Sequence, residues 1–344
     1  MTVNKFPDRK ILIENKKFLY FGGTSYLGLS TNKKFQKIVA KNLKKWGSGY
    51  GSSRNANVKL SAYEKGENAL ANFIHAEKAL TISSGMLAGK LVVDTLENQI
   101  DCFFHFPNLH NALKSKNSLP FFIDKKLNSR LLDNKIEKIT IVTDSVPSSY
   151  IRQVDLSVLE LISNSKEITL VIDESHSLGI LGENGCGIYS TINYPNINRK
   201  IMIASLGKAI GLTGGVIASD SEFINQIKLN DSYVSAAGMN PAFVKSIHDS
   251  KKIFVKQHKK LHKNLAFIKT KLLQNDLIDF DFSYPLIYPR IENIYSIFKE
   301  NEIIITNFPY PNEIGELNRI VITANHKQKD LQKMINVLNN YFLA

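Results

Sequence analysis

The sequence predicts an α/β fold in which a mostly parallel central sheet is covered by helices on both faces. Short apolar runs alternate with amphipathic helical patterns from about residue 79 to residue 218, and this alternation is typical of parallel strands joined by crossover helices. After Pro241 the pattern changes to a long amphipathic helix followed by a few strands. We therefore expect three parts: an N-terminal segment (1–45) that packs with a small domain, a large α/β domain (46–240), and a long linker helix with a small C-terminal α+β domain (241–344).

The first elements are predicted from capping and periodicity. Residues 11–21 favour strands that join the small domain. Residues 32–46 favour a helix, because Asn32 can cap its start, apolar side chains recur on one face and Gly47 follows the last turn.

The central elements follow from short apolar runs. These runs predict buried strands at residues 79–82, 102–104, 121–123, 139–142, 168–172, 201–204 and 216–218. Helical patterns lie between several of them, including 86–96 and 156–162.

The C-terminal elements begin with a helix that carries lysines on one face. Its apolar stripe predicts one long helix from residue 242 to about residue 274. Strands at 303–306 and 320–323 and a closing helix around 331–338 complete the small domain.

The composition is that of a globular protein. Of the 344 residues, 43% are apolar and 22% are charged, which is close to the average for such domains, and no apolar run is long enough to span a bilayer. The two cysteines, Cys102 and Cys186, and a polar N-terminus without the apolar core of a secretory signal predict a cytoplasmic protein that does not enter membranes.

The chain is basic, with a formal net charge of +13. Such a charge suits nucleic acid, an anionic membrane or an anionic small molecule. The lysines form no block of five or six like charges, so we interpret them as a solvated surface that is compatible with a phosphate-bearing ligand. No recognition motif accompanies the lysine-rich helix, which leaves nucleic-acid binding as a remote hypothesis, and we expect no nucleic-acid partner.

Ligands of open parallel sheets bind at the carboxyl ends of the strands, so the segments directly after the apolar runs are the candidate site. Ser84, Gly85 and Met86 open a helix whose N–H groups and dipole favour a phosphate, although they also suit an ordinary helix cap. Asp173 ends another run, where a carboxylate is costly unless it meets a positive partner. His176 follows it without a further ligand at a metal-binding spacing.

Lys208 stands among glycine and apolar residues in the segment that begins at Ser205. Such surroundings disfavour an ammonium group and lower its pKa, as an imine-forming amine requires, although a lysine in a glycine-rich turn can also reach solvent. His105 and His110 follow the strand at 102–104, and either can be a hydrogen-bonded core residue.

Together these groups match the needs of one cofactor. A helix N-terminus for a phosphate, a carboxylate, a histidine and a desolvated lysine are the groups that pyridoxal 5′-phosphate requires. We therefore predict this cofactor and no metal ion, with Lys208 forming the Schiff base and Asp173 pairing with the pyridine nitrogen.

The same residues, in the same order, resemble the α-oxoamine synthase family of fold-type I pyridoxal-phosphate enzymes, which belongs to the class I/II aminotransferase superfamily. Members of this family include 8-amino-7-oxononanoate synthase and 2-amino-3-oxobutyrate CoA ligase. The resemblance runs from about Tyr20 to His326. It rests on the segments TSYLGL (24–29), GSGYGSSR (47–54), SGM (84–86), DESHSLG (173–179), SLGKAIGLTGG (205–215) and RIVITANH (319–326).

The resemblance implies roles for single residues. Lys208 would be the Schiff-base lysine, Asp173 the partner of the pyridinium nitrogen and His176 the donor to the ring hydroxyl. His110 would stack on the ring, because its surroundings are the more similar to the family pattern, and His105 stays as the alternative, because it lies at the family's usual distance after Asp101. The remaining implied contacts are Ser84, Gly85, Met86 and Ser205 for the phosphate, and Arg319 and Ser25 for the substrate.

The resemblance also implies a reaction, the condensation of an amino acid with an acyl-CoA, and a homodimer. Some positions depart from the family pattern: Tyr63 stands near a usual histidine, Gly207 replaces a serine, Ser25 replaces an asparagine, and residues 235–237 lack the usual Ser-Thr pair. An aminotransferase on the same fold needs the same cofactor groups and Arg319 but no thioester site, so it is the alternative prediction.

Overall fold

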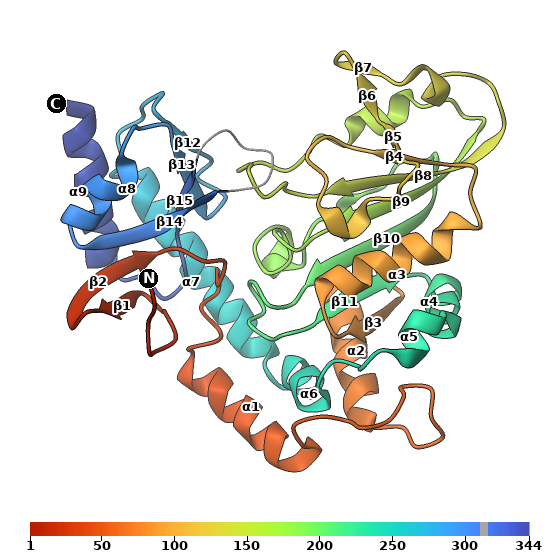
Figure 1. Cartoon of the computed structure of the whole chain (residues 1–344), viewed down its shortest axis with the longest axis horizontal. Coiled ribbons are helices and arrows are strands. Elements are labelled where there is room, and N and C mark those ends of the chain that lie inside the picture. The colour runs from red at the N-terminus through yellow and green to blue at the C-terminus, as the bar shows by residue number, and fades with distance from the viewer. Residues whose placement is uncertain (310–315, 344) are drawn as a thin grey trace.

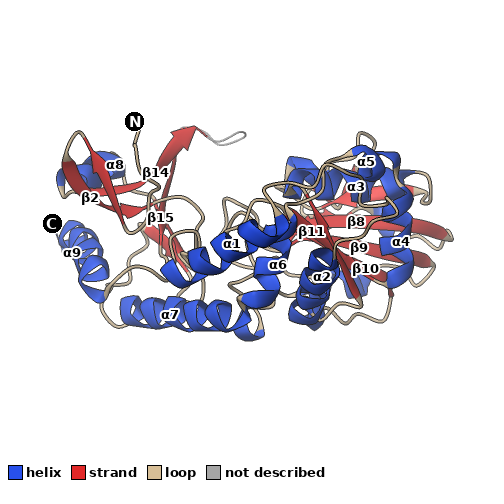
Figure 2. Ribbon diagram, turned by 90° about the horizontal axis from the view of Figure 1, so that it is seen from below, coloured by secondary structure: helices blue, strands red, loops and turns tan. Residues whose placement is uncertain are grey.

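Two separate sheets organise the chain (Figure 1). The structure is a computed structural model that describes residues 1–309 and 316–343. Within these residues the larger sheet has the strand order β3-β11-β10-β9-β8-β4-β5, and the smaller has the order β1-β2-β14-β15-β13-β12. Helices link the two sheets along one side of the molecule (Figure 2).

The larger sheet is mostly parallel, as the sequence predicts. Only β11 runs antiparallel to its neighbours, β10 and β3. The strands are β3 (Lys78–Ile82), β4 (Cys102–His105), β5 (Leu119–Pro120), β8 (Glu137–Asp144), β9 (Lys166–Asp173), β10 (Ile197–Ser205) and β11 (Gly215–Ser219).

Both faces of the larger sheet are buried. Alternate side chains of a strand point to opposite faces, so Ile201 and Ile203 of β10 pack in one apolar cluster while Met202 and Ala204 pack in another. The helices of this part are α2 (Ser61–Ile74), α3 (Gly85–Glu97), α4 (Ser221–Leu229), α5 (Asp231–Ser235) and α6 (Pro241–Asp249).

Two predictions in this domain are wrong in detail. Residues 121–123 do not form a strand of the large sheet, because Phe122–Ile123 (β6) pairs instead with Lys126–Leu127 (β7). Asp124 and Lys125 between them have φ values of 49° and 64°, and positive φ at both turn residues suits a tight hairpin. The segment 156–162 is reduced to a short 3₁₀ helix, Ser157–Leu161.

The smaller sheet combines both ends of the chain. β2 lies parallel to β14, so the N-terminal hairpin joins the C-terminal strands. The strands are β1 (Lys10–Ile13), β2 (Lys16–Phe21), β12 (Ile278–Phe280), β13 (Leu286–Pro289), β14 (Ile303–Pro309) and β15 (Glu316–Val321). The helices near them are α7 (Lys251–Lys269), α8 (Ile294–Glu300) and α9 (Gln328–Leu343).

The helix α1 (Lys33–Trp46) begins as predicted, with the Asn32 side chain accepting from the N–H groups of Lys34 and Phe35. It packs against α6, which in turn packs against α2.

The predicted single helix over 242–274 is wrong. The chain forms α6 and α7, which meet at Ser250 with φ −111° and ψ 6°, and α7 ends at Lys269. Ser250 is fully buried, and the bend lets α6 pack on α1 and α2 while α7 extends toward the smaller sheet (Figure 2). The sequence has no glycine or proline at this point, so tertiary packing rather than local propensity makes the break.

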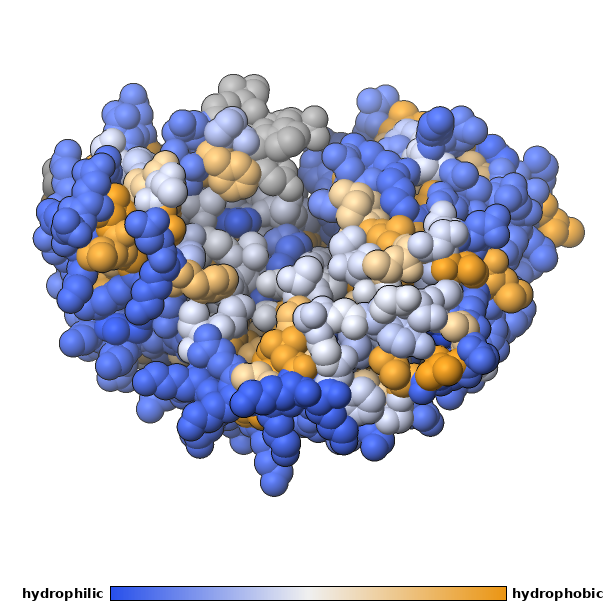
Figure 3. Space-filling view, turned by 60° about the horizontal axis from the view of Figure 1, so that its bottom comes forward, coloured by the Kyte–Doolittle hydropathy of each residue, from blue (hydrophilic) through white to orange (hydrophobic). Residues whose placement is uncertain are grey.

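The face of the molecule drawn in Figure 3 is mainly hydrophilic. In the space-filling view of Figure 3, polar residues cover most of the face and apolar residues form small separate patches. Among the residues that the structure describes, no helix combines the length and the apolar character that crossing a membrane requires.

His326 connects β2 with the loop after β15 through stacking and hydrogen bonds. Its ring stacks on Phe21, with the ring centroids 4.1 Å apart. Its Nε2 donates to the carbonyl oxygen of Tyr20 at 2.9 Å, and its Nδ1 accepts from the N–H of Thr323 at 3.0 Å. Both nitrogens are therefore satisfied in the neutral form, and burial lowers the pKa of His326 to about 4.

Acidification is expected to weaken the fold through His326. Its pKa is about 4 when folded and 6.5 otherwise, so the folded chain binds fewer protons between these values, and stability is full above pH 6.5 and falls toward pH 4. Between pH 7 and pH 5 the parent should lose about 2 kcal/mol more unfolding free energy than a His326→Gln variant. Urea unfolding at both pH values measures this difference, and equal losses in the two proteins would contradict it.

Candidate active site

Two acidic side chains stand together at the carboxyl ends of neighbouring parallel strands. Asp144 ends β8 and Asp173 ends β9, and the two are register partners. Each is 7% exposed. Burial and then the charge of Asp173 raise the pKa of Asp144 well above its usual value, because two adjacent buried carboxylates cannot both ionise. We therefore assign the neutral form to Asp144. Oδ1 of Asp173 accepts from the N–H of Ser175 at 2.8 Å.

Lys208 lies in the turn between β10 and β11, facing these carboxyl groups. The turn is closed by hydrogen bonds from Leu206 N to Gly214 O at 2.9 Å and from Leu212 N to Leu206 O at 3.0 Å. Lys208 is half-buried. Burial lowers the pKa of its ammonium, with opposition from the charges of Asp173 and Asp144. The result is an amine that loses its proton more easily than a surface lysine and is held near a carboxylate.

His110 and His105 lie in different surroundings. Burial lowers the pKa of His110. The charge of Asp173 opposes this shift and the charge of Lys208 adds to it. The backbone N–H group of His110 donates to Oδ2 of Asp144 at 3.2 Å. His105 instead shares a hydrogen bond of 2.9 Å with Ser118 at the edge of the sheet. The structure thus brings His110 to the carboxylate pair, and His105 points to the sheet edge.

His176 is held by two tyrosines. Its Nδ1 shares a hydrogen bond of 3.0 Å with the hydroxyl of Tyr26, and its carbonyl oxygen accepts from the hydroxyl of Tyr284 at 2.8 Å. Burial, and then the positive charges of Lys208 and Arg319, lower the pKa of His176 well below its usual value. His176 is therefore a neutral imidazole with its other ring nitrogen available.

The start of α3 packs directly on the end of β10. Ser84 caps the helix, with its Oγ accepting from the N–H of Leu87 at 3.1 Å. A Cβ atom on Gly85 would lie 2.9 Å from the Cβ of Ser205, so only glycine fits this contact. Because the first N–H groups of a helix have no partner within it, the turn offers donors beside Ser205. Met86 is 47% exposed.

Arg319 reaches the site from β15 of the smaller sheet. Its side chain is 6% exposed, yet its Nε has no hydrogen-bond partner among the described residues. Its charge acts on Lys208 and His176, and the hydroxyl groups of Tyr26, Tyr284 and Tyr288 surround it. A buried guanidinium with an unused donor suits a carboxylate ligand.

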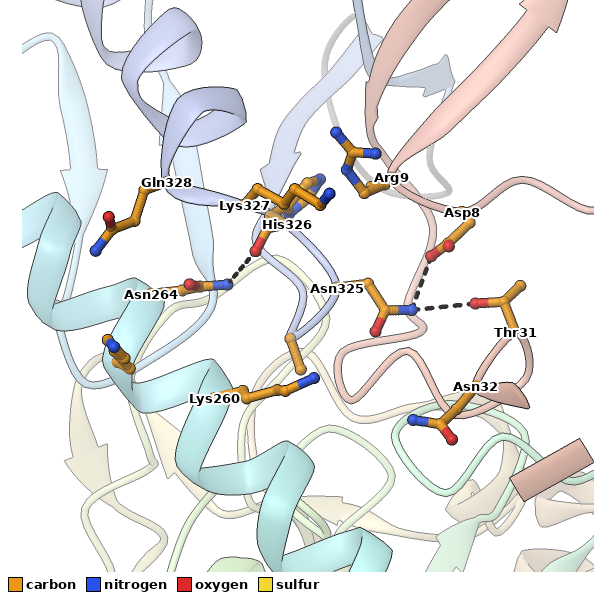
Figure 4. Close-up of a pocket in the computed structure, with 12 residues that line it drawn as sticks. Asp8, Arg9, Thr31, Asn32, Lys260, Asn264, Asn325, His326, Lys327 and Gln328 are labelled. Carbon is orange, nitrogen blue, oxygen red and sulfur yellow. Dashed lines mark hydrogen bonds between the residues drawn. The ribbon is translucent and has the colours of Figure 1, made fainter. Parts of the chain in front are cut away.

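Ser25 lines a cavity of about 430 Å³ that also reaches Gly207, the neighbour of Lys208. Most of its wall is apolar. It includes Phe35, Val39, Leu43, Leu212 and Phe243. A larger cavity of about 510 Å³ lies elsewhere, between the N-terminal segment, α7 and the start of α9, and none of the predicted site residues lines it (Figure 4).

Sequence reasoning missed Asp144, Tyr26 and Tyr284. Asp144 follows the predicted strand at 139–142 in the same way that Asp173 follows the strand at 168–172. This similarity in position is the signal that could have identified Asp144 as a site residue. Tyr26 stands inside the TSYLGL segment. No local signal marks Tyr284, since it lies in the segment between β12 and β13, far along the chain from His176.

Tyr63 lies outside this group. Its hydroxyl donates to the carbonyl oxygen of Met239 at 2.8 Å, and its ring lies under the guanidinium of Arg54 at 3.6 Å. Arg54 in turn pairs with Glu67 at 3.0 Å. Tyr63 therefore belongs to a buried network that joins α2 to the segment before α6.

The residues fit pyridoxal phosphate. Asp144 Oδ1 and Arg319 Nε are buried polar atoms without a hydrogen-bond partner in the described part of the chain, and both residues lie near enough to Lys208 to act on its charge. The helix start at Gly85 packs closely on Ser205 at the end of β10 and forms a small cradle, and the first N–H groups of a helix have no partner within it and suit an anion. Lys208, whose pKa is lowered by burial, follows Ser205 by three residues and lies near enough to Asp173 for the two charges to interact.

The comparisons with known proteins agree with this fit. The sequence profile of the aminotransferase class I and II family matches residues 16–338. A putative 8-amino-7-oxononanoate synthase of Rippkaea orientalis is 26% identical, over 98% of this chain and 93% of its own length. The serine palmitoyltransferase of Sphingobacterium spiritivorum is also 26% identical, over 78% of this chain and 70% of its own length.

Solved structures confirm the predicted fold. The serine palmitoyltransferase of Sphingomonas wittichii superposes with a TM-score of 0.81 at 18% identity, covering 98% of this chain and 91% of that one. The 8-amino-7-oxononanoate synthase of Francisella tularensis gives a TM-score of 0.68 at 23% identity, with coverage of 95% and 98%.

Proposed function

The chain belongs to the aminotransferase class I and II family and is a pyridoxal-phosphate-dependent transferase, and we propose that it condenses an amino acid with the acyl group of an acyl-CoA. The observation that carries this proposal is the meeting of Lys208, Asp173 and Arg319 in one cluster of interacting charges, with an apolar cavity at the neighbouring Gly207. The names of relatives that match nearly the whole chain, 8-amino-7-oxononanoate synthase above all, support the same reaction.

Pyridoxal phosphate, when bound, supplies an electron sink for the carbon atom that carries the amino group of the substrate. Lys208 would hold its aldehyde carbon. Asp173 would hold its ring nitrogen in the protonated form, through the oxygen that Ser175 does not occupy. Since Asp144 is neutral, it leaves the full charge of Asp173 for this contact. His176 would donate to the ring hydroxyl, and His110 would lie on the ring face.

Lys208 also moves a proton. Burial lowers the pKa of its ammonium, so its Nζ is able to accept the proton from the substrate Cα and to return it later. Arg319 would hold the substrate carboxylate through paired N–H donors. This contact would orient the Cα–H bond toward Lys208, and Ser25 lines the neighbouring cavity.

The phosphate would lie at the start of α3. The N–H groups of Gly85 and Met86 and the hydroxyls of Ser84 and Ser205 supply neutral donors there, and the helix dipole adds a favourable field. No positive side chain is needed at this position.

The apolar cavity next to Gly207 suits the acyl chain. Its wall includes Phe35, Val39, Leu212 and Phe243, and these apolar side chains would pack against the methylene groups of an acyl chain. Burying each further methylene there is worth about 0.8 kcal/mol, or about fourfold in kcat/KM. An aminotransferase has no need of such a cavity beside its lysine.

The function is tested by thiol release. The purified cofactor-loaded protein is mixed with single amino acids and with acyl-CoAs of increasing chain length, and free CoA is followed with a thiol reagent. The two cysteines, Cys102 and Cys186, are buried, so the background is low. We expect CoA release only when both substrates are present, rising with acyl length. Release without an amino acid, or transfer of an amino group to a keto acid without CoA release, would contradict the proposal.

We also propose a cytoplasmic homodimer. The dimer is supported by family membership and by the exposed Met86 at the edge of the cradle. The cytoplasmic location is supported by two cysteines that stay as free thiols.

A further inference from the structure

Two histidines lie one helical turn apart on α7 and face the same carbonyl oxygen. The Nε2 atoms of His258 and His262 are 3.0 Å apart, and they lie 3.0 Å and 3.3 Å from the carbonyl oxygen of Ile180. The ring centroids are 4.3 Å apart. Both rings are half-buried, so this cluster remains open to water on one side.

In this cluster the two Nε2 atoms and the oxygen of Ile180 can accept more hydrogen bonds than the neutral imidazoles can donate to them. A neutral imidazole carries one N–H group, and two Nε2–H groups 3.0 Å apart would point their hydrogens at each other. At most one of the two Nε2 atoms is therefore protonated in a favourable arrangement. The second Nε2 and the oxygen of Ile180 then present lone pairs toward the same small space.

The two Nε2 atoms and the oxygen of Ile180 form a triangle whose sides are close to the distances between neighbouring ligands of a metal ion. Zinc holds imidazole nitrogens at about 2.0–2.1 Å, which in a tetrahedral site places neighbouring ligands about 3.3 Å apart. The observed sides of the triangle are 3.0, 3.0 and 3.3 Å. Zinc sites on helices also use two histidines that lie one turn apart.

We propose that His258, His262 and the carbonyl oxygen of Ile180 form a binding site for one first-row divalent cation of the Zn²⁺ or Ni²⁺ type, with water completing the coordination. Among the described residues no cluster of three or more His, Cys, Asp or Glu side chains is placed to hold a metal. This site differs because its third donor is a main-chain oxygen.

The ion would tie α7 to the loop that follows His176. Ile180 belongs to this loop, and Glu174 holds other parts of it through the Ser177 hydroxyl and the N–H groups of Ile188 and Tyr189, each at 2.7 Å. α7 leads from the large domain to the smaller sheet. A cation at this point would therefore stiffen the connection between the two parts of the molecule without touching Lys208.

Calorimetric titration of the full-length, cofactor-loaded protein with Zn²⁺, Ni²⁺ and Mg²⁺ tests the site. We expect one equivalent of Zn²⁺ and of Ni²⁺ to bind, and no binding of Mg²⁺, which prefers oxygen ligands. His258→Gln and His262→Gln should each weaken Zn²⁺ binding at least tenfold. His248→Gln is the matched control, because His248 lies one residue before the end of α6 and pairs with Asp249; it should change the affinity less than twofold.

The proposal fails if no saturable equivalent binds, or if either glutamine variant binds Zn²⁺ like the parent. A second measurement needs no variant and covers the case in which a glutamine variant does not fold. The electron paramagnetic resonance spectrum of the parent with one equivalent of Cu²⁺ should show superhyperfine coupling to two nitrogens. Coupling to one nitrogen, or to none, would also overturn the proposal.

Discussion

Replacing Lys208 with alanine is expected to reduce turnover by about a thousandfold or more. The variant loses the amine that holds the cofactor and also the group that moves the Cα proton, and each contribution alone is worth about 10²–10⁴-fold. The visible absorbance of the cofactor-loaded protein should disappear from the variant after dialysis against a competing amine. Steady-state CoA release and an absorbance scan measure the two effects.

Lys200 provides the matched control. It is also half-buried, lies on β10 and has a pKa that burial lowers, but its ammonium donates to the carbonyl oxygens of Tyr189 and Ile192. Lys200→Met should keep the absorbance, since this lysine does not face Asp173. An absorbance that persists in Lys208→Ala, or that is lost in Lys200→Met, would show that the lysine is wrongly assigned.

Replacing Asp173 with asparagine is expected to lower kcat by about 10²–10³-fold, while part of the cofactor stays bound. The amide carries no charge, so it no longer stabilises a proton on the ring nitrogen, and the loss of one such preorganised electrostatic contact costs this much. The cradle at Gly85 and the lysine remain in place, which explains the residual cofactor. Steady-state kinetics together with the cofactor content of the purified variant measure the effect.

Asp144→Asn is the matched variant for Asp173→Asn. It makes the same change of side chain at a carboxyl group that carries no charge. Because the pKa of Asp144 is raised by burial and by Asp173, the residue is neutral before the substitution, and the amide preserves its size. We expect a loss in kcat of less than about tenfold, far below that of Asp173→Asn. Equal losses in the two variants, or a larger loss from Asp144→Asn, would mean that the charge lies on the other member of the pair.

The sequence predicted the parts of the site that follow local rules. The apolar runs ending at Asp173 and before Ser205 were visible as strands, and the rule that ligands bind at their carboxyl ends pointed to Asp173 and Lys208. The helix cap at Ser84 was equally local. Family resemblance then supplied Arg319, which no periodicity could connect to the other residues.

The features that sequence reasoning missed depend on long-range pairing. The neutral state of Asp144 results from its burial and from its register opposite Asp173, and no segment of sequence specifies register by itself. The bend at Ser250 arises because α6 must pack on α1 and α2. The histidine pair on α7 has a visible spacing, but its third donor, the oxygen of Ile180, comes from a loop that only the fold brings near.

Borohydride reduction followed by peptide mapping tests the central claim most directly, since it identifies the side chain that binds the cofactor. The cofactor-loaded protein is reduced, digested and analysed by mass spectrometry. We predict one phosphopyridoxyl group per chain, on the peptide that contains Lys208. A label on any other lysine, or a reduced protein without a label, would contradict the account.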